Sequence, residues 1–167
     1  MRFAPAAAAL SLMFAVTASV GQSAQLVADP RAAALVAEGR GALAAGDTQR
    51  AVDAFEAALA ADPAYTPIFI DLAEAARREG LPGKAIALYR EALERDPDNL
   101  VAMAGVGRAM LEKGAVEKAR ATLAKLESVC GSNCAETRQL AAAIAQAPQP
   151  RTLAAESVMP EPVVTQN

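Results

Sequence analysis

Apolar segments of the chain are separated at regular positions by glycine and by Asp-Pro. Asp29 with Pro30 is typical of a helix start, because an aspartate caps the first free N–H groups and proline fits the first turn. We expect one helix from Pro30 to about Ala45, ended by Gly46, and a second over residues 48–61. No sustained alternating run rich in Val, Ile or Thr predicts a strand, so the fold is expected to be all-α.

This two-helix pattern returns with a fixed offset of 34 residues. The segment AVDAFEAALAADP from Ala51 aligns with AIALYREALERDP from Ala85, and ARATLAKLESVCG follows from Ala119. The glycines that end the first helix of each unit share one position: Gly46, Gly80 and Gly114. The pattern predicts three units over residues 32–65, 66–99 and 100–133, after a short lead-in over 25–31.

The period and the residues at shared positions resemble the tetratricopeptide repeat. That family has small residues where paired helices touch, a large residue in the second helix, and a closing proline. The corresponding residues here are Gly39, Ala73 and Gly107; Phe55, Tyr89 and Leu123; and Pro63 and Pro97. The third unit departs from the pattern, with Leu126 in place of Ala and Gly131 in place of Pro, as expected of a last unit before a cap. The resemblance implies an α-solenoid of three helix-turn-helix repeats.

A solenoid of three repeats needs a polar cap, and residues 134–146 fit a capping helix with Leu140 and Ile144 on one side. Residues 147–167 contain four prolines and few large apolar residues, so we expect a disordered tail, in which TLAAESVM could form a helix on a partner.

The first 24 residues are typical of a cleavable signal peptide. Arg2 precedes an apolar run over 3–16, and small residues cluster near Ala24. An uncleaved anchor is the alternative, because residues 3–20 are just long enough to span a membrane. Cleavage predicts a periplasmic or secreted protein, with no membrane association afterwards.

Composition excludes several classes of function. The formal net charge is −3, and without Arg2 it becomes −4, with no basic stripe that would indicate a nucleic-acid partner. The chain has no histidine and no Gly-rich phosphate loop after a strand, so we expect no enzyme and no cofactor.

The two cysteines lie in CGSNC, at the position where earlier units turn by Asp-Pro. A zinc site needs about four ligands, and a thioredoxin-like centre has two residues between its cysteines rather than three. We therefore predict a structural Cys130–Cys134 disulfide and no metal site, as suits an oxidising compartment.

The resemblance implies a concave groove lined by the first helices, where family members hold peptides. The groove positions are Val36, Arg40, Leu43, Ile70, Glu74, Arg77, Arg78, Val101, Ala104, Arg108 and Leu111. Arginine pairs well with carboxylates, so an acidic or C-terminal peptide is the expected ligand. The alternative is that these arginines form only a solvated helix face. The Lys and Asn clamp with which one subgroup grips chaperone tails is missing, for example at Pro67 and Asp71.

Together these features predict a protein-interaction module, an adaptor or assembly factor that holds a peptide segment of an envelope partner. A self-associating subunit whose groove is filled by another helix is one alternative, and a holdase chaperone is another. The partner's identity and the oligomeric state are left open.

Overall fold

A computed structural model describes residues 27–147 of the chain, and this part contains seven helices and no strand. The helices are α1 (Pro30–Ala44), α2 (Thr48–Ala61), α3 (Pro67–Arg78), α4 (Pro82–Arg95), α5 (Leu100–Glu112), α6 (Val116–Cys130) and α7 (Ala135–Gln146). The predicted signal peptide and nearly all of the predicted tail lie outside the described residues.

Local sequence signals determine where the helices begin and end. The Asp29 side chain accepts hydrogen bonds from the N–H groups of Arg31 and Ala32 at the start of α1, as predicted. Gly46 follows α1 with a φ of 83°, a left-handed conformation that glycine adopts without the steric cost of a Cβ. Gly80 and Gly114 have the same conformation after α3 and α5, so each helix pair turns in the same way.

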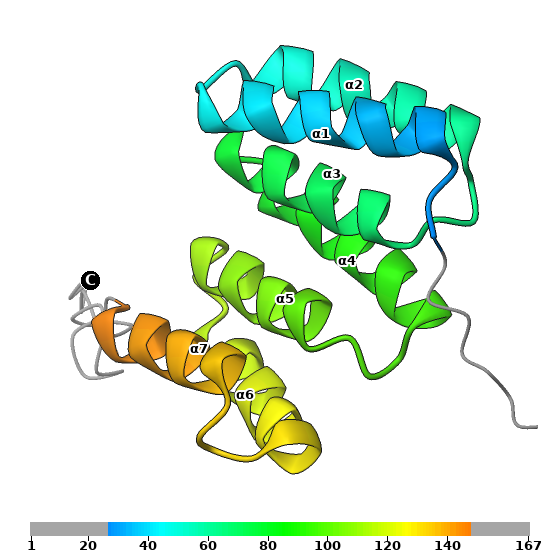
Figure 1. Cartoon of the computed structure of the whole chain (residues 1–167). Helices are drawn as coiled ribbons and strands as arrows, with labels where there is room; N and C mark the ends of the chain where they lie inside the picture. The colour runs from blue at the N-terminus through cyan, green and yellow to red at the C-terminus, as the bar shows by residue number, and fades with distance from the viewer. Residues whose placement is uncertain (1–26, 148–167) are drawn as a thin grey trace, which may run out of the picture.

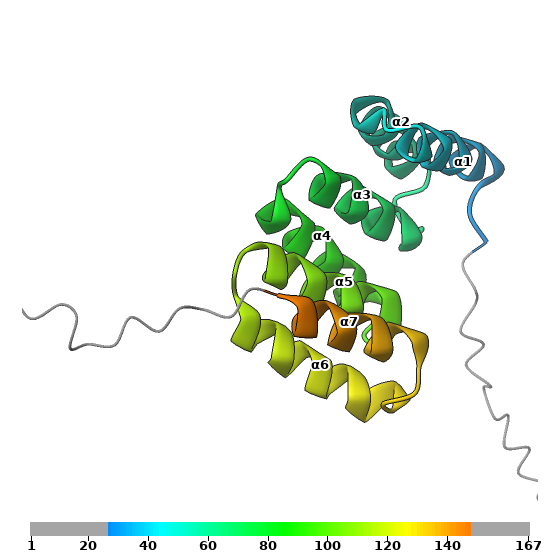
Figure 2. The same cartoon turned by 90° about the vertical axis from the view of Figure 1, so that its left-hand side faces the viewer.

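The helices pack as three antiparallel pairs in chain order, with α7 against the last pair (Figure 1). The first helices form one row, in which α1 contacts α3, α3 contacts α5 and α5 contacts α7. We call the surface of this row the first-helix face. The second helices α2, α4 and α6 form the other row; α4 and α6 each pack on α5, but their backbones do not approach each other (Figure 2).

Close helix contacts depend on glycine. A Cβ at Gly39 would lie 2.5 Å from the ring of Phe55, and one at Gly107 would lie 2.5 Å from a methyl group of Leu140. Gly105 has an equally close neighbour in the ring of Tyr89, a contact that the repeat pattern did not indicate. These helices approach so closely only because the glycines carry no side chain.

A disulfide joins α6 to α7, as the sequence predicted. Cys130 is the last residue of α6, Cys134 is the N-cap of α7, and their Cα atoms are 6.0 Å apart. The buried Thr137 hydroxyl lies 2.9 Å from the sulfur of Cys134, and because a disulfide has no proton, the hydroxyl is the donor. Leu140 and Ile144 of α7 are buried against the last pair, so α7 covers the end of the core.

Among residues 27–147, no helix is both long and apolar enough to cross a membrane.

Candidate functional site

The first-helix face carries most of the arginines that the sequence places in a groove, and ion pairs connect its neighbouring helices. Arg40 on α1 donates through Nε and Nη2 to the two carboxylate oxygens of Asp71 on α3, at 3.0 Å and 2.8 Å. Burial raises the pKa of Asp71, and the hydrogen bond from Arg40 opposes that rise. The two-point contact holds α1 in register with α3, and it already occupies the Arg40 guanidinium.

A second ion-pair cluster connects α3 with α5. Arg77 donates to Glu74 at 2.7 Å, and also to Glu112, whose Oε1 lies 2.9 Å from the arginine Nε. Burial lowers the pKa of Arg77, but the hydrogen bond to Glu112 and the charge of Glu74 outweigh it, so the guanidinium stays charged. The Tyr89 hydroxyl completes the cluster by donating to Glu74 at 3.2 Å. Burial and the charge of Glu74 raise the pKa of Tyr89, which keeps the phenol protonated.

Arg78 also has a structural partner. Its Nη1 donates to the backbone carbonyl of Leu43 at 2.7 Å, near the C-terminus of α1, where carbonyl groups lack partners within the helix. The sequence placed Leu43 and Val36 at the ligand surface, but both side chains are buried in the core between α1, α2 and α3. They support the face from below and present almost no surface to a ligand.

Arg108 on α5 differs from these arginines. Within residues 27–147, no carboxylate lies within ion-pair distance of its guanidinium, although Glu112 and Arg77 line the same cleft. This cleft has a volume of about 320 Å³ and lies where α3, α5 and α7 meet. We call it the Arg108 cleft; its lining residues are Arg77, Arg108, Leu111, Glu112, Ala143, Gln146 and Ala147.

The structure therefore separates the predicted groove residues into four groups. Arg40, Glu74, Arg77 and Arg78 hold neighbouring helices together, while Val36, Leu43 and Ala104 lie in the core. Ile70 is half-buried on α3, and Val101 is exposed at the start of α5. Arg108 and Leu111 are available in the cleft.

Sequence reasoning missed the part that α7 plays in this site. The capping helix contributes Ala143 and Gln146 to the cleft wall. Their small or neutral side chains give no chemical signal, and only the docking of α7 on α5 brings them beside Arg108. Asp71 was also not recognised as the partner of Arg40.

The chemistry that the cleft offers is pairing of a guanidinium with a carboxylate. Arg108 offers a planar set of donors beside apolar surface from Leu111 and Ala143, which suits an acidic group next to an apolar side chain. In the described part of the chain, no three His, Cys, Asp or Glu residues gather in a way that could hold a metal ion.

Two sequence-family models match the chain. Both are described as the tetratricopeptide repeat; one covers residues 36–99 and the other residues 76–129. The matched segments together span residues 36–129, which is more than half of the 167 residues. Comparison with curated proteins found none that matches.

The chain is also similar to solved structures of the same architecture. The TPR2B domain of yeast Sti1, in a complex with pHsp70, has a TM-score of 0.63 at 23% identity, over 71% of this chain and 98% of that one. The second TPR domain of human RPAP3, bound to an HSP70 peptide, has a TM-score of 0.61 at 19% identity, over 70% and 96%. The Yersinia enterocolitica type III secretion chaperone SycD, with a peptide of the translocator YopD, has a TM-score of 0.59 at 18% identity, over 68% and 86%. At identities this low, the similarity shows a shared fold alone.

Proposed function

Because the chain belongs to the tetratricopeptide repeat family, whose solved relatives include peptide complexes, we propose that it is a protein-interaction module that holds an acidic peptide segment on its first-helix face. The observation that carries the proposal is the Arg108 cleft. The Arg108 guanidinium has no ion-pair partner among the described residues, whereas Arg40 and Arg77 are each paired with a carboxylate. A peptide carboxylate would complete the same kind of pair at Arg108.

The proposed partner is a protein of the bacterial envelope, and the proposed location is the periplasm. The apolar run after Arg2 supports export, and the Cys130–Cys134 disulfide is the kind of bond that persists in an oxidising compartment. In this proposal the protein acts as an adaptor or assembly factor.

Photocrosslinking in living cells tests the proposal. A photoreactive residue replaces Leu111, which lines the cleft, and in a control strain it replaces Glu56, an exposed residue of α2. We expect one envelope protein to be captured from position 111 and not from position 56. A ladder of many products would favour a holdase, and capture of only this chain would favour self-assembly; either result would overturn the adaptor proposal.

A matched pair of variants then tests the anchor. Arg108→Ala should weaken binding of the captured partner's acidic segment roughly tenfold or more, because the peptide carboxylate loses its charged donor. Arg138→Ala removes the same charge from an exposed position on α7 and should leave binding unchanged. Equal binding by both variants would show that Arg108 does not contact the ligand.

A further inference from the structure

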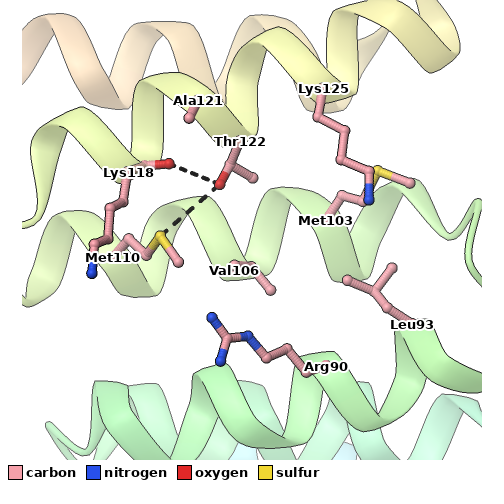
Figure 3. Close-up of a pocket in the computed structure, with 9 residues that line it drawn as sticks. All are labelled: Arg90, Leu93, Met103, Val106, Met110, Lys118, Ala121, Thr122 and Lys125. Carbon is pink, nitrogen blue, oxygen red and sulfur yellow. Dashed lines mark hydrogen bonds between the residues drawn. The ribbon is translucent and has the colours of Figure 1, made fainter.

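A second cleft lies on the opposite side of the solenoid, where α5 forms the floor between α4 and α6 (Figure 3). It has a volume of about 450 Å³. The floor is apolar, with Met103, Val106 and Met110 from α5, and Leu93 of α4 forms part of the wall. The backbones of α4 and α6 do not approach each other, but their side chains cover most of this part of α5: Met103 and Val106 are buried, and Met110 is half-buried.

Cations surround this apolar floor. Arg90 reaches into the cleft from α4, while Lys118 and Lys125 extend over α5 from α6 (Figure 3). A neighbouring hollow of about 330 Å³ shares Arg90, Met110 and Lys118 with the cleft, and it adds Lys113. We call the two hollows together the basic trough.

The charge of the trough is not neutralised by its own walls. No aspartate or glutamate is among the lining residues of either hollow, and no ion pair within residues 27–147 involves Arg90, Lys113, Lys118 or Lys125. On the first-helix face, by contrast, three of the four arginines are paired with carboxylates. A patch of four uncompensated cations on a chain of net charge −3 is therefore a local feature.

The preceding repeat gives an internal comparison. Residues 34 positions before Arg90, Lys113 and Lys125 are Glu56, Glu79 and Glu91, so three of the four charges are reversed there. In that repeat Leu88 occupies the place of Thr122, and Leu88 packs both against the core between α1, α2 and α3 and against the core between α3, α4 and α5. An apolar floor with basic walls is thus found between α4 and α6 but not between α2 and α4. The tetratricopeptide fold therefore does not in itself require the trough.

We propose that the basic trough is a second protein-binding site, which receives an acidic amphipathic helix of a partner protein. The floor residues Met103, Val106 and Met110 are spaced as one stripe of a helix and span about 10 Å, or two helical turns. A helix with an apolar stripe and carboxylates on both edges would cover the floor and pair with cations of both walls. Methionine side chains adapt to the shapes of different apolar partners, which suits such a floor. This site does not depend on the function proposed for the first-helix face.

Binding of a designed probe tests this site in the full-length protein. The probe is a short synthetic helix with leucine along one face and glutamate on both edges, and a peptide of the same composition in scrambled order is the control. Lys118→Glu with Lys125→Glu should weaken probe binding about tenfold or more, because two attractive contacts become repulsive. The matched variant Arg31→Glu with Lys84→Glu makes the same change in net charge at exposed positions outside the trough and should bind as the wild type does.

Methionine methyl signals in NMR spectra locate the bound probe. Met103 and Met110 both line the trough, so the probe should shift their methyl signals, whereas the scrambled peptide should not. Arg108→Ala should leave these shifts unchanged, which distinguishes this site from the Arg108 cleft.

Several results would overturn the proposal. They are the absence of saturable probe binding, equal binding of the scrambled peptide, and equal loss in the two double variants. Loss of binding in Arg108→Ala would assign the probe to the first-helix face instead. Binding of phosphatidylglycerol vesicles through Lys118 and Lys125, without binding of the probe, would make the trough a lipid-binding surface.

Discussion

Replacing Gly107 with alanine has two opposing effects on the free energy of unfolding. Within a helix, Gly→Ala is favourable by up to about 1 kcal/mol, because alanine loses less backbone freedom on folding. A Cβ at position 107, however, would lie 2.5 Å and 2.8 Å from the two methyl carbons of Leu140, well inside contact distance. Leu140 is fully buried on α7 and cannot turn into solvent, so we expect an overpacking cost of roughly 1–3 kcal/mol. Gly107→Ala should therefore destabilise the fold by about 1 kcal/mol, and Gly107→Leu by more.

Gly41 provides the matched control, because it lies in α1 and a Cβ there would meet nothing within 4 Å. Gly41→Ala should stabilise the protein by roughly 0.5–1 kcal/mol. Urea unfolding followed by circular dichroism measures both free energies of unfolding.

A double-mutant comparison makes the test sharper. Leu140→Ala alone should cost about 2–5 kcal/mol, because it leaves a cavity under α7. Once Leu140 is shortened, the added methyl group at Gly107 has room, and Gly107→Ala should become stabilising. If Gly107→Ala has the same sign in both backgrounds, the contact between Gly107 and Leu140 does not control this helix approach, and the reasoning fails.

Further predictions concern charged groups and the disulfide. Arg77→Ala should lower the free energy of unfolding by roughly 1–3 kcal/mol, because it removes the charged donor that Glu74 and Glu112 share, whereas Arg108→Ala should not change it measurably in urea unfolding. Burial raises the pKa of Asp71 in the folded state, so its protonation favours folding below the unfolded pKa, and this contribution is lost as pH rises through the folded pKa. The wild type should accordingly lose less stability than Asp71→Asn on acidification through about pH 4, as measured by urea midpoints across pH; parallel curves would contradict this. Reduction of Cys130–Cys134 should cost about 2 kcal/mol for so short a loop, and intact mass should rise by about 2 Da on reduction; no change in mass would mean that the bond is absent.

Helix positions were predictable because their signals are local. Asp29 caps its own helix and Gly46 ends it through its own backbone conformation, so neither depends on distant residues. The disulfide was predictable for a similar reason, because Cys130 and Cys134 are joined by a short turn.

Contacts between helices were much less predictable. The partners of Arg40 and Arg77 lie 31 and 35 residues away, and whether they meet depends on how each helix is rotated about its axis. Val36 was misplaced for this reason: α1 packs on both α2 and α3, so a position that looks like groove surface in one helix is core in the assembled pair. The close approach of Gly105 to Tyr89 was missed because the equivalent residue one repeat earlier is Asp71, and the pattern showed no shared small residue there.

The capping helix α7 supplies part of the wall of the Arg108 cleft, so a ligand bound there as proposed would have an affinity that depends on the stability of that end of the solenoid. Opening of α7 would remove Ala143 and Gln146 from the site, so a ligand that needs them binds only the closed form. By linkage, the ligand must then hold α7 closed, by about 2.7 kcal/mol when its free concentration is 100 times its dissociation constant. Slower hydrogen exchange of the α7 amides would therefore report occupancy of the cleft, and reduction of the disulfide would weaken binding without altering any residue that touches the ligand.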